Sequence, residues 1–412
     1  MKQARVLGMI IAGGKGERLH PLTRERSKPA VPFGGRHRII DFVLSNFVNS
    51  TLLSLYVLVQ YKSQSMIEHL RLAWRTGGLV PDHFITVVPP QMRFGESWYR
   101  GTADAVLQNV NLIDDYGPDL VAVFGADHIY RMDIKQMIAF HQERQASVTV
   151  AARPVPIGEA PSFGILAVDR DGRVVSFEEK PARPQPMPGD PHRAYASMGN
   201  YVFSRQALLD TLLADARRST EHDFGRTIIP ELVPAGGVFA YDFQTNEVPG
   251  VKPYEEPAYW RDVGTLEAYW QSHMDLLGES PRFDLDNRHW PIRVGRYNGP
   301  PARIIGGEVD NAHVAEGSLV KRATIRNSIL GRGVWVNEGA VIDDSIVMDN
   351  TTVGKGARLR RAIVDRFNII PADADMGWDP AADRRRYHVE PSGLVVIPRG
   401  GRREFLSGLE DF

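Results

Sequence analysis

The sequence predicts an α/β domain with a largely parallel sheet, followed by a left-handed parallel β-helix. Apolar runs alternate with amphipathic segments from residue 6 to residue 152, a pattern typical of strands and helices in such a sheet. Beyond residue 330 the pattern changes, and apolar residues recur every six positions. With 412 residues, 43% of them hydrophobic, the chain is long enough to build a core for both parts.

The elements of the first part follow from the spacing of the apolar residues. We expect strands at residues 6–12, 55–60, 85–88, 120–124 and 147–152. We expect helices at residues 41–49, 64–75, 103–113, 134–141, 207–213 and 265–277. Asp41 is the expected N-cap of the first helix, and Gly278 suits the C-terminal cap of the last.

The second part is predicted from its six-residue period. The repeating apolar positions are Leu330, Val336, Ile342 and Met348, followed after one five-residue step by Val353 and Leu359. A plain β-meander is the alternative, but the regular steps favour stacked solenoid coils. We therefore expect a catalytic domain at residues 1–282, a linker at 283–303, and the β-helix with a C-terminal tail at 304–412.

Composition and charge exclude several classes of protein. The formal net charge of −1 argues against a general nucleic-acid binder, and the absence of cysteine excludes disulfides and thiolate metal sites. No stretch approaches the length of a membrane span, and the N-terminus lacks a signal-peptide cleavage pattern. We expect a soluble, cytoplasmic protein.

A glycine-rich turn follows the first predicted strand. Gly13, Gly14 and Gly16 let the backbone turn tightly and present its N–H groups, and Arg18 and Lys28 supply positive charge nearby. The pattern fits a polyphosphate cradle, although an ordinary turn with solvated cations would look similar. It matches neither the Walker spacing nor the dinucleotide fingerprint.

Carboxylates stand where a metal ion could be held. Asp127 directly follows a buried strand, and Asp262 is a second candidate for an oxygen-preferring cation such as Mg²⁺. Each aspartate alone could instead be a helix cap or a surface ion-pair partner. Glu179 and Lys180 could bind a sugar phosphate or simply protect an edge strand with charge.

The order of the motifs resembles one family of enzymes. The segments are AGGKGERL, SKPAVPFGG, RIIDFVLSN, WYRGTADAV, GADHIY, FEEKP, ASMGNYVF, HDFG and YWRDVGTLEAYW. This order is similar to that of the bacterial ADP-glucose pyrophosphorylases, over roughly the first 290 residues and in the hexapeptide region. The resemblance implies a Rossmann-like nucleotidyltransferase domain that makes ADP-glucose and pyrophosphate from ATP and α-D-glucose 1-phosphate for glycogen synthesis. A transferase for another nucleotide and sugar, and a non-catalytic regulatory subunit, are the alternatives.

The resemblance also implies roles for individual residues. The catalytic residues would be Arg18, Lys28, Asp127, Lys180 and Asp262, with Asp127 and Asp262 as the Mg²⁺ ligands. The nucleotide would be bound by Gly13, Gly14, Gly16, Gln60, Tyr99, Gly101 and Thr102. Glucose 1-phosphate would be bound by Gly164, Glu179, Lys180, Ser197, Tyr201, Asp223 and Trp260. The family also implies regulation by phosphorylated or small anionic effectors, near Arg36 after the Phe-Gly-Gly turn, and a homotetramer. The basic cluster with Arg384 and Arg386 is an effector candidate from its charge, because arginine suits phosphate binding, although arginine-rich tails are more often solvated.

Overall fold

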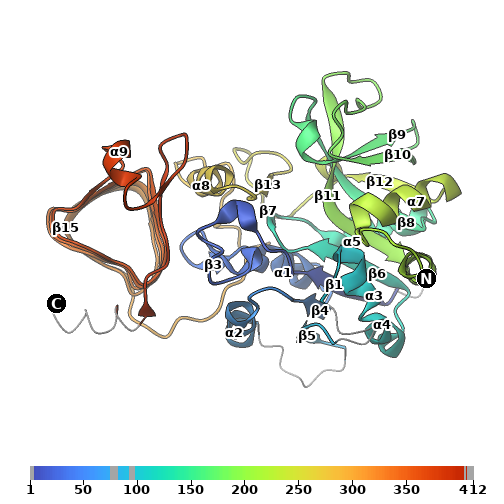
Figure 1. The fold of residues 1–412 in the computed structure, drawn as a ribbon, viewed down its shortest axis with the longest axis horizontal. Helices are drawn as coiled ribbons and strands as arrows, with labels where there is room; N and C mark the ends of the chain where they lie inside the picture. The colour runs from blue at the N-terminus through green and yellow to red at the C-terminus, as the bar shows by residue number, and fades with distance from the viewer. Residues whose placement is uncertain (1–3, 75–81, 92–97, 403–404, 406–412) are drawn as a thin grey trace.

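The computed structural model describes residues 4–74, 82–91, 98–402 and 405 (Figure 1). An α/β part and a three-sided β-helix lie next to each other, with helix α8 (Leu266–Met274) between them. Within the described residues, none of the helices has the length and apolar character needed to cross a bilayer.

The centre of the α/β part is a parallel sheet in the order β5-β4-β1-β6. Its strands are β1 (Val6–Ile11), β4 (Ser54–Leu58), β5 (Phe84–Val88) and β6 (Leu120–Gly125). β1 pairs with β4 on one side and with β6 on the other, and its side chains are buried in apolar cores on both faces of the sheet. Because parallel strands end at the same edge, the loops that follow β1 and β6 lie side by side there.

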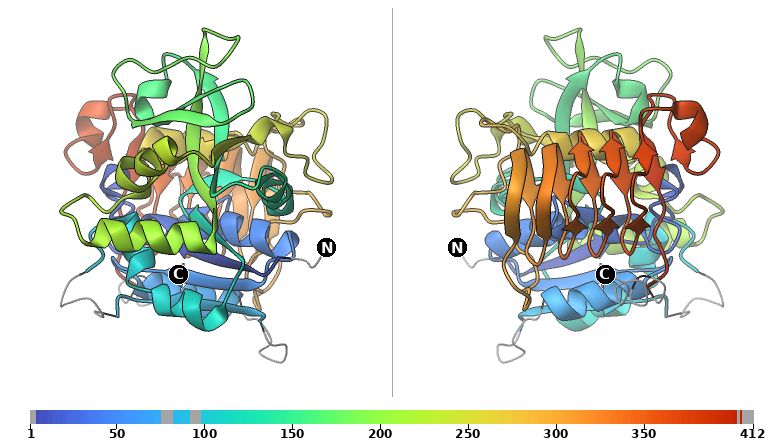
Figure 2. Two further views of the ribbon diagram at one scale, coloured as in Figure 1. Left: turned by 90° about the vertical axis from the view of Figure 1, so that its right-hand side faces the viewer. Right: turned by 90° about the vertical axis from the view of Figure 1, so that its left-hand side faces the viewer.

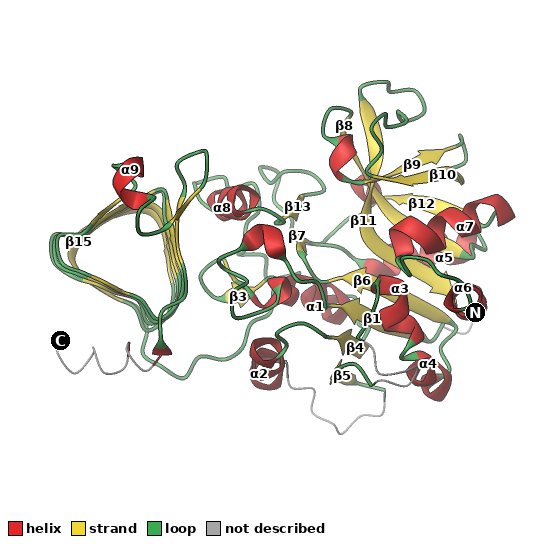
Figure 3. Cartoon of the chain, viewed as in Figure 1, coloured by secondary structure: helices red, strands yellow, loops and turns green. Residues whose placement is uncertain are grey.

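A second group of strands extends this sheet through one long antiparallel strand, β11 (Arg193–Ser204) (Figure 3). β11 also pairs with β8 (Val148–Pro156) and β9 (Gly164–Val168), and its register shifts between Ser197 and Tyr201. The remaining strands are β10 (Val174–Glu179), which pairs with β9, and β12 (Val238–Asp242), which pairs with β8. The sheet is therefore mostly parallel, with a branch that carries residues 164–201 above the central strands.

Helices cover both faces of the sheet. One apolar core joins the sheet to α1 (Ile40–Asn49), α2 (Gln64–Ala73) and α5 (Ile134–Glu143). The other joins it to α3 (Thr102–Leu107), α4 (Val110–Tyr116) and α6 (Arg205–Ala216). The predicted end of the second helix, Arg75, lies outside the described residues.

Two predictions about these helices were wrong. Asp41 is not an N-cap: α1 begins at Ile40, and the fully buried Asp41 carboxylate accepts hydrogen bonds from the backbone N–H of Arg38 and the indole of Trp74. The predicted helix at 103–113 is two helices. Asn109 lies at the break, where its amide donates to the carbonyl of Ala105 and to the phenol of Tyr99.

The C-terminal part is a parallel β-helix, seen end-on in Figure 1 and from the side in the right-hand view of Figure 2. It starts with the long strands β14 (Arg303–Val314) and β15 (Leu319–Leu330). Shorter strands stack on them: β16 (Trp335–Val336), β17 (Val341–Asp343), β18 (Ile346–Val347), β19 (Thr352–Val353), β20 (Arg358–Arg360), β21 (Ala362–Val364), β22 (Ile369–Ile370) and β23 (Asp375–Met376). The hexapeptide prediction of a β-helix is confirmed.

The coil length explains the one five-residue step in the sequence. Ile325, Ile342, Leu359 and Met376 pair in register on successive coils. Likewise, the hydroxyl of Ser328 accepts from the backbone N–H of Ser345, and that of Ser345 accepts from the N–H of Ala362, each 17 residues further along the chain. Two steps of six residues and one of five therefore complete each three-sided turn, and apolar residues stack inside it. The predicted position Met348 was wrong by one residue: Val347 stacks on Leu330, while Met348 packs in the core between the β-helix and the α/β part.

The two parts share an apolar interface. Ile329, Ile346 and Ile363 of the β-helix belong to the same core as Phe33 and Trp270 of the α/β part. Polar contacts reinforce it: Trp270 donates to the carbonyl of Asp344, and Arg361 pairs with Glu267 on α8. Residues 275–302, all of them described, contain no helix or strand; the predicted linker at 283–303 falls in this stretch except for Arg303, which begins β14.

Candidate functional site

The glycine turn after β1 is shaped by a close approach to Lys28. Gly16 has φ +64°, and a Cβ atom there would lie 2.9 Å from the Cβ of Lys28. Gly13 packs against Gln60, where an added Cβ would lie 3.3 Å away. Glycine is required at Gly16 because a side chain would meet both backbone strain and a collision. The turn thus packs directly against Lys28.

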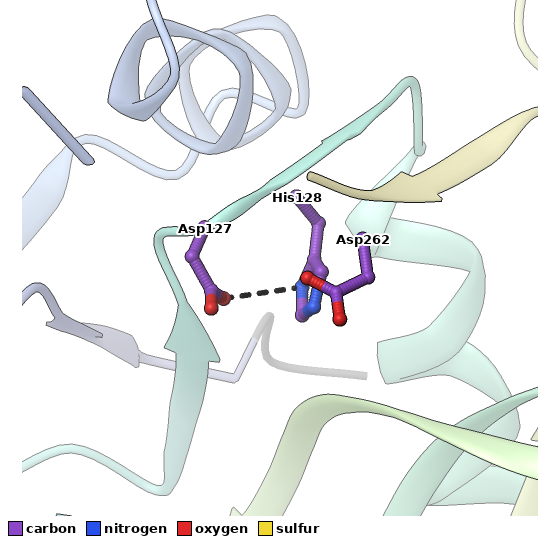
Figure 4. Close-up of side chains that lie close together, drawn as sticks. All are labelled: Asp127, His128 and Asp262. Carbon is purple, nitrogen blue, oxygen red and sulfur yellow. Dashed lines mark ion pairs between the residues drawn. The ribbon is translucent and has the colours of Figure 1, made fainter. Parts of the chain in front are cut away.

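An acidic cluster faces this turn (Figure 4). Asp127 lies just after β6, and Asp262 ends β13 (Trp260–Asp262), which pairs with β7 (His128–Tyr130) so that Asp262 is opposite His128. One ligand atom from each of Asp127, His128 and Asp262 lies within 4.8 Å of the others. The two aspartates, 135 positions apart in the chain, converge because the β7–β13 ribbon bridges them.

The cluster already binds one cation of the chain itself. The Nζ of Lys28 lies 3.0 Å from Asp127 Oδ2 and 2.9 Å from Asp262 Oδ1, and Arg18 lies 3.9 Å from Asp262. Burial lowers the pKa of Lys28, but the two carboxylates outweigh that effect and the pKa is raised. Burial likewise opposes ionisation of Asp127, but His128 and Lys28 outweigh it and hold its pKa below the usual range. The lysine and Asp127 are therefore both charged at neutral pH.

These donors fit a hard divalent cation. The oxygens of Asp127 and Asp262 are partly exposed, at 40% and 26% of the side chain, so they can bind a cation that keeps water and phosphate ligands. Mg²⁺ usually takes one or two carboxylates in this way. His128 is the less suitable donor because its ring packs against Trp260, with centroids 4.7 Å apart.

The branch strands supply the opposite wall. Glu179 ends β10, an edge strand, and pairs with Lys180 at 3.9 Å. Glu179 thus lies on an edge strand, Lys180 directly follows it, and both residues line the larger cavity described below. Burial, opposed by Lys180, raises the pKa of Glu179. A Cβ at Gly164 would lie 2.7 Å from both the Glu179 carboxylate and the ring of Phe177, so a side chain there would displace one or both of them.

A threonine and an aspartate join the two sides of the site. Thr102, at the start of α3, donates its hydroxyl to Asp223 Oδ2 at 2.9 Å and accepts from the backbone N–H of Phe224. The other oxygen of Asp223 caps the short π-helix η4 (Phe224–Ile228) by accepting from Gly225 and Arg226. The Asp223 carboxylate is therefore fixed from both directions.

Gln60 holds the backbone of the neighbouring loop. Its amide donates to the carbonyl of Tyr99 at 3.2 Å and accepts from the N–H of Tyr99 at 2.7 Å. The phenol of Tyr99 accepts from Asn109. Since its amide makes these two bonds to the main chain, Gln60 sets the position of Tyr99.

These residues line two adjoining cavities. The larger, about 700 Å³, is lined by all seven residues predicted for glucose 1-phosphate and by the five predicted catalytic residues. The smaller, about 240 Å³, is lined by six of the predicted nucleotide residues: Gly13, Gly14, Gln60, Tyr99, Gly101 and Thr102. Gly16 lines the larger one, while Gly14 and Thr102 line both. The sequence did not single out Gly264, which also lines the larger cavity and where a Cβ would lie 2.8 Å from Arg18.

The predicted effector residues lie elsewhere. Arg36, in the turn between β2 (Pro32–Phe33) and β3 (His37–Arg38), pairs with Glu316 of the β-helix at 2.6 Å. Arg384 and Arg386 follow the short helix α9 (Pro380–Asp383) and are exposed. Among the described residues, no hydrogen bond or ion pair links either of them to the loop that carries Arg36.

Sequence reasoning missed a group of arginines at the interface of the two parts. Arg26 is 1% exposed and pairs with Asp365 at 2.5 Å, yet its Nε and Nη1 have no partner in the described structure. Burial, together with repulsion from Arg26, lowers the pKa of Arg38 to about 10 and that of Arg366 to about 9. Arg26 lies two positions before Lys28, but only the fold shows that it is buried.

Comparison with known proteins agrees with this geometry. The sequence matches the family described as nucleotidyl transferase over residues 7–279, and a GlmU-like C-terminal hexapeptide family over residues 300–397. A glucose-1-phosphate adenylyltransferase of Thermodesulfovibrio yellowstonii is 52% identical over 399 residues, which cover 97% of each chain. Relatives of the same name from Anaeromyxobacter sp. and Photobacterium profundum are 48% and 47% identical, over 97% and 96% of this chain and 100% and 98% of their own. The chain therefore belongs to the nucleotidyl transferase family and, within it, to the glucose-1-phosphate adenylyltransferases.

Proposed function

We propose that the protein transfers the adenylyl group of ATP to α-D-glucose 1-phosphate, giving ADP-glucose and pyrophosphate for glycogen synthesis. The observation that carries the proposal is the convergence of the glycine turn, the Lys28–Asp127–Asp262 cluster and the Glu179–Lys180 pair around one cavity. The names of its relatives support the choice of nucleotide and sugar.

The nucleotide is assigned to the glycine side of the site. We propose that the N–H groups of Gly13, Gly14 and Gly16, with Arg18 and Lys28, bind the triphosphate. The base and ribose would occupy the smaller cavity beside Gln60, Tyr99, Gly101 and Thr102. Both cations are next to the turn, so the negative charge of the leaving pyrophosphate would develop beside them.

Glucose 1-phosphate is assigned to the branch side. We propose that Lys180 binds its phosphate, while Glu179, Ser197, Tyr201, Asp223 and the backbone at Gly164 contact the sugar. Trp260 is 3% exposed, and its indole N–H has no partner among the described residues although the residue lines the cavity. An unpaired buried donor is costly, so a sugar oxygen or a water is its expected acceptor.

The reaction is an in-line displacement. An oxygen of the sugar phosphate attacks the α-phosphorus of ATP, a new P–O bond forms, and the bond to the β-phosphate breaks to release pyrophosphate. The attacking oxygen is already ionised, so no general base is needed. Two like charges about 4 Å apart cost roughly 4 kcal/mol at an effective dielectric near 20, and the side chains of Arg18, Lys28 and Lys180 offset this repulsion. Mg²⁺, when held by Asp127 and Asp262, supplies further positive charge to the phosphates.

We also propose regulation by a phosphorylated or small anionic effector, in a cytoplasmic homotetramer. Arg36, Arg384 and Arg386 remain the residues predicted for it. The interface arginines Arg26 and Arg366 support an anion site as well, since each has a buried guanidinium nitrogen without a partner in the described structure. Assaying activity against a panel of sugar phosphates, pyruvate and AMP tests this; no response to any of them would refute it.

Product identification tests the main proposal. The protein with Mg²⁺, glucose 1-phosphate and ATP should release pyrophosphate and form ADP-glucose, whereas UTP, dTTP and GTP should give far lower rates. Asp262→Asn, which keeps the volume of the side chain, is the matched negative control. Equal rates with another nucleotide would assign the site to a different sugar nucleotide, and no product with any of them would refute catalysis.

A further inference from the structure

A buried aspartate–histidine pair lies behind the site. Asp215, near the end of α6, and His222 are each 2% exposed, and Oδ2 of Asp215 is 2.6 Å from Nδ1 of His222. An ionised carboxylate only accepts, so the histidine donates this hydrogen bond. Thr220 completes the group by donating to the other oxygen of Asp215 at 2.6 Å and accepting from the backbone N–H of His222.

The backbone of His222 meets the start of α3. Its carbonyl accepts the N–H groups of Ala103 at 2.9 Å and Asp104 at 3.3 Å. The contact is tight, because a Cβ at Gly101 would lie 2.3 Å from that carbonyl oxygen. His222 also has φ +50°, a left-handed conformation that a histidine adopts only when its surroundings hold it there.

This contact lies between the two halves of the site. Gly101 and Thr102 line the smaller cavity, and Asp223, the residue after His222, lines both. The hydroxyl of Thr102 is bonded to Asp223. A shift of the His222 carbonyl would therefore move the nucleotide side and the sugar side together. Neither Asp215 nor His222 lines either cavity.

We propose that Asp215 and His222 are positioning residues for the transferase reaction. The pair holds the 220–223 loop in its left-handed turn, and the loop in turn fixes the distance between the Gly101–Thr102 segment and Asp223. This inference rests on the proposed function for its substrates. It adds to that function a pair of residues that contact neither substrate but align both.

Variants at His222 distinguish an effect on the positioning of the substrates from an effect on the stability of the fold. His222→Asn keeps a side-chain N–H donor, and asparagine tolerates the left-handed conformation, so its kinetic constants should stay within about threefold of the wild type. His222→Ala loses both features, and we expect the KM values for ATP and glucose 1-phosphate to rise together by about fivefold or more, with a fall in kcat. Leu212→Ala, a buried apolar truncation on the same helix, is the control, because it lowers the unfolding midpoint while its side chain makes none of the hydrogen bonds that hold the 220–223 loop.

If the Asp215–His222 pair only stabilised the fold, these variants would give a different result. If His222→Ala and Leu212→Ala both lower the unfolding midpoint but leave both KM values unchanged, the positioning role is refuted. If His222→Ala does not fold, Asp215→Asn carries the test, since it removes one acceptor at constant volume and should raise both KM values about threefold. If the wild type makes no ADP-glucose, the proposed function fails separately. The pair is then tested by calorimetric binding of ATP, which His222→Ala should weaken about fivefold.

Discussion

Lys28→Met should bind a divalent metal ion more tightly than the wild type and yet be almost inactive. In the structure, the ammonium of Lys28 is bonded to one oxygen of each aspartate, at 3.0 and 2.9 Å. A metal ion that binds between Asp127 and Asp262 must compete with this ammonium. Methionine has a similar length without the charge, so it frees both carboxylates.

The magnitude follows from the distances. At an effective dielectric near 20, each ammonium–carboxylate attraction at about 3 Å is roughly 5 kcal/mol. Desolvation of the lysine, whose side chain is 8% exposed, offsets much of this, and solvent screens the 40% exposed Asp127. We expect that removal of the lysine makes the free energy of metal binding more favourable by about 1.4 kcal/mol, which is a tenfold gain in affinity. Turnover should fall by about 100-fold or more, as it does when one preorganised donor is removed.

Calorimetric titration with Mn²⁺ in the absence of nucleotide measures the affinity. Lys15→Met is the matched control: this lysine is on the same turn, is 69% exposed and pairs only loosely with Glu17 at 3.8 Å, so its loss should leave Mn²⁺ affinity unchanged. If Lys28→Met binds Mn²⁺ no better than the wild type, the lysine does not compete with the metal ion for these oxygens.

Three further predictions concern the cluster, the sugar side and the core. Asp127→Asn should lower kcat by orders of magnitude, because it removes one of the two carboxylates that face the turn; steady-state rates near those of the wild type would refute the metal role. Lys180→Ala should raise the KM for glucose 1-phosphate more than that for ATP, and the opposite ratio would reassign this lysine to the nucleotide. Burial lowers the pKa of His141 from 6.5 to about 4, so its contribution to stability is complete above pH 6.5 and is lost as the pH falls toward 4. His141→Gln should therefore reduce the pH dependence of the free energy of unfolding in that window, by up to about 1.4 kcal/mol per pH unit in urea titrations.

The sequence predicted the elements that depend on local pattern. The strand that precedes the glycine turn and the strand that precedes Asp127 are parallel neighbours, as apolar runs alternating with helices require. The six-residue period predicted the β-helix because each side of a coil buries one apolar residue. Asp41 was misread because an aspartate before an apolar helix usually caps it, whereas this one is buried against Trp74, 33 residues away.

Motif order named residues that line the two cavities, but it did not indicate their geometry. Nothing local indicates that Lys28 lies between Asp127 and Asp262, since the three residues come from separate segments that meet only through the β7–β13 ribbon. The same holds for His222, which the sequence offered only as part of the HDFG segment. Its proposed function as a support depends on Asp215, which lies beyond the end of the predicted helix at 207–213 and within the observed α6.

The interface arginines show most clearly why regulation was the weakest prediction. A run of arginines in the tail has an obvious charge pattern, and so Arg384 and Arg386 were chosen, but both are exposed to solvent. Arg26 and Arg366 are 340 positions apart and meet only because the β-helix coils back against the α/β part. Charge that is solvated at a surface costs little and attracts anions weakly, whereas a buried guanidinium group with unpartnered N–H groups, as at Arg26 beside its ion pair with Asp365 and at Arg366, has donors left for an anion that reaches it. Burial, which a sequence does not state, therefore decides which arginines can sense an effector. By that criterion the interface is the better place to look than the tail.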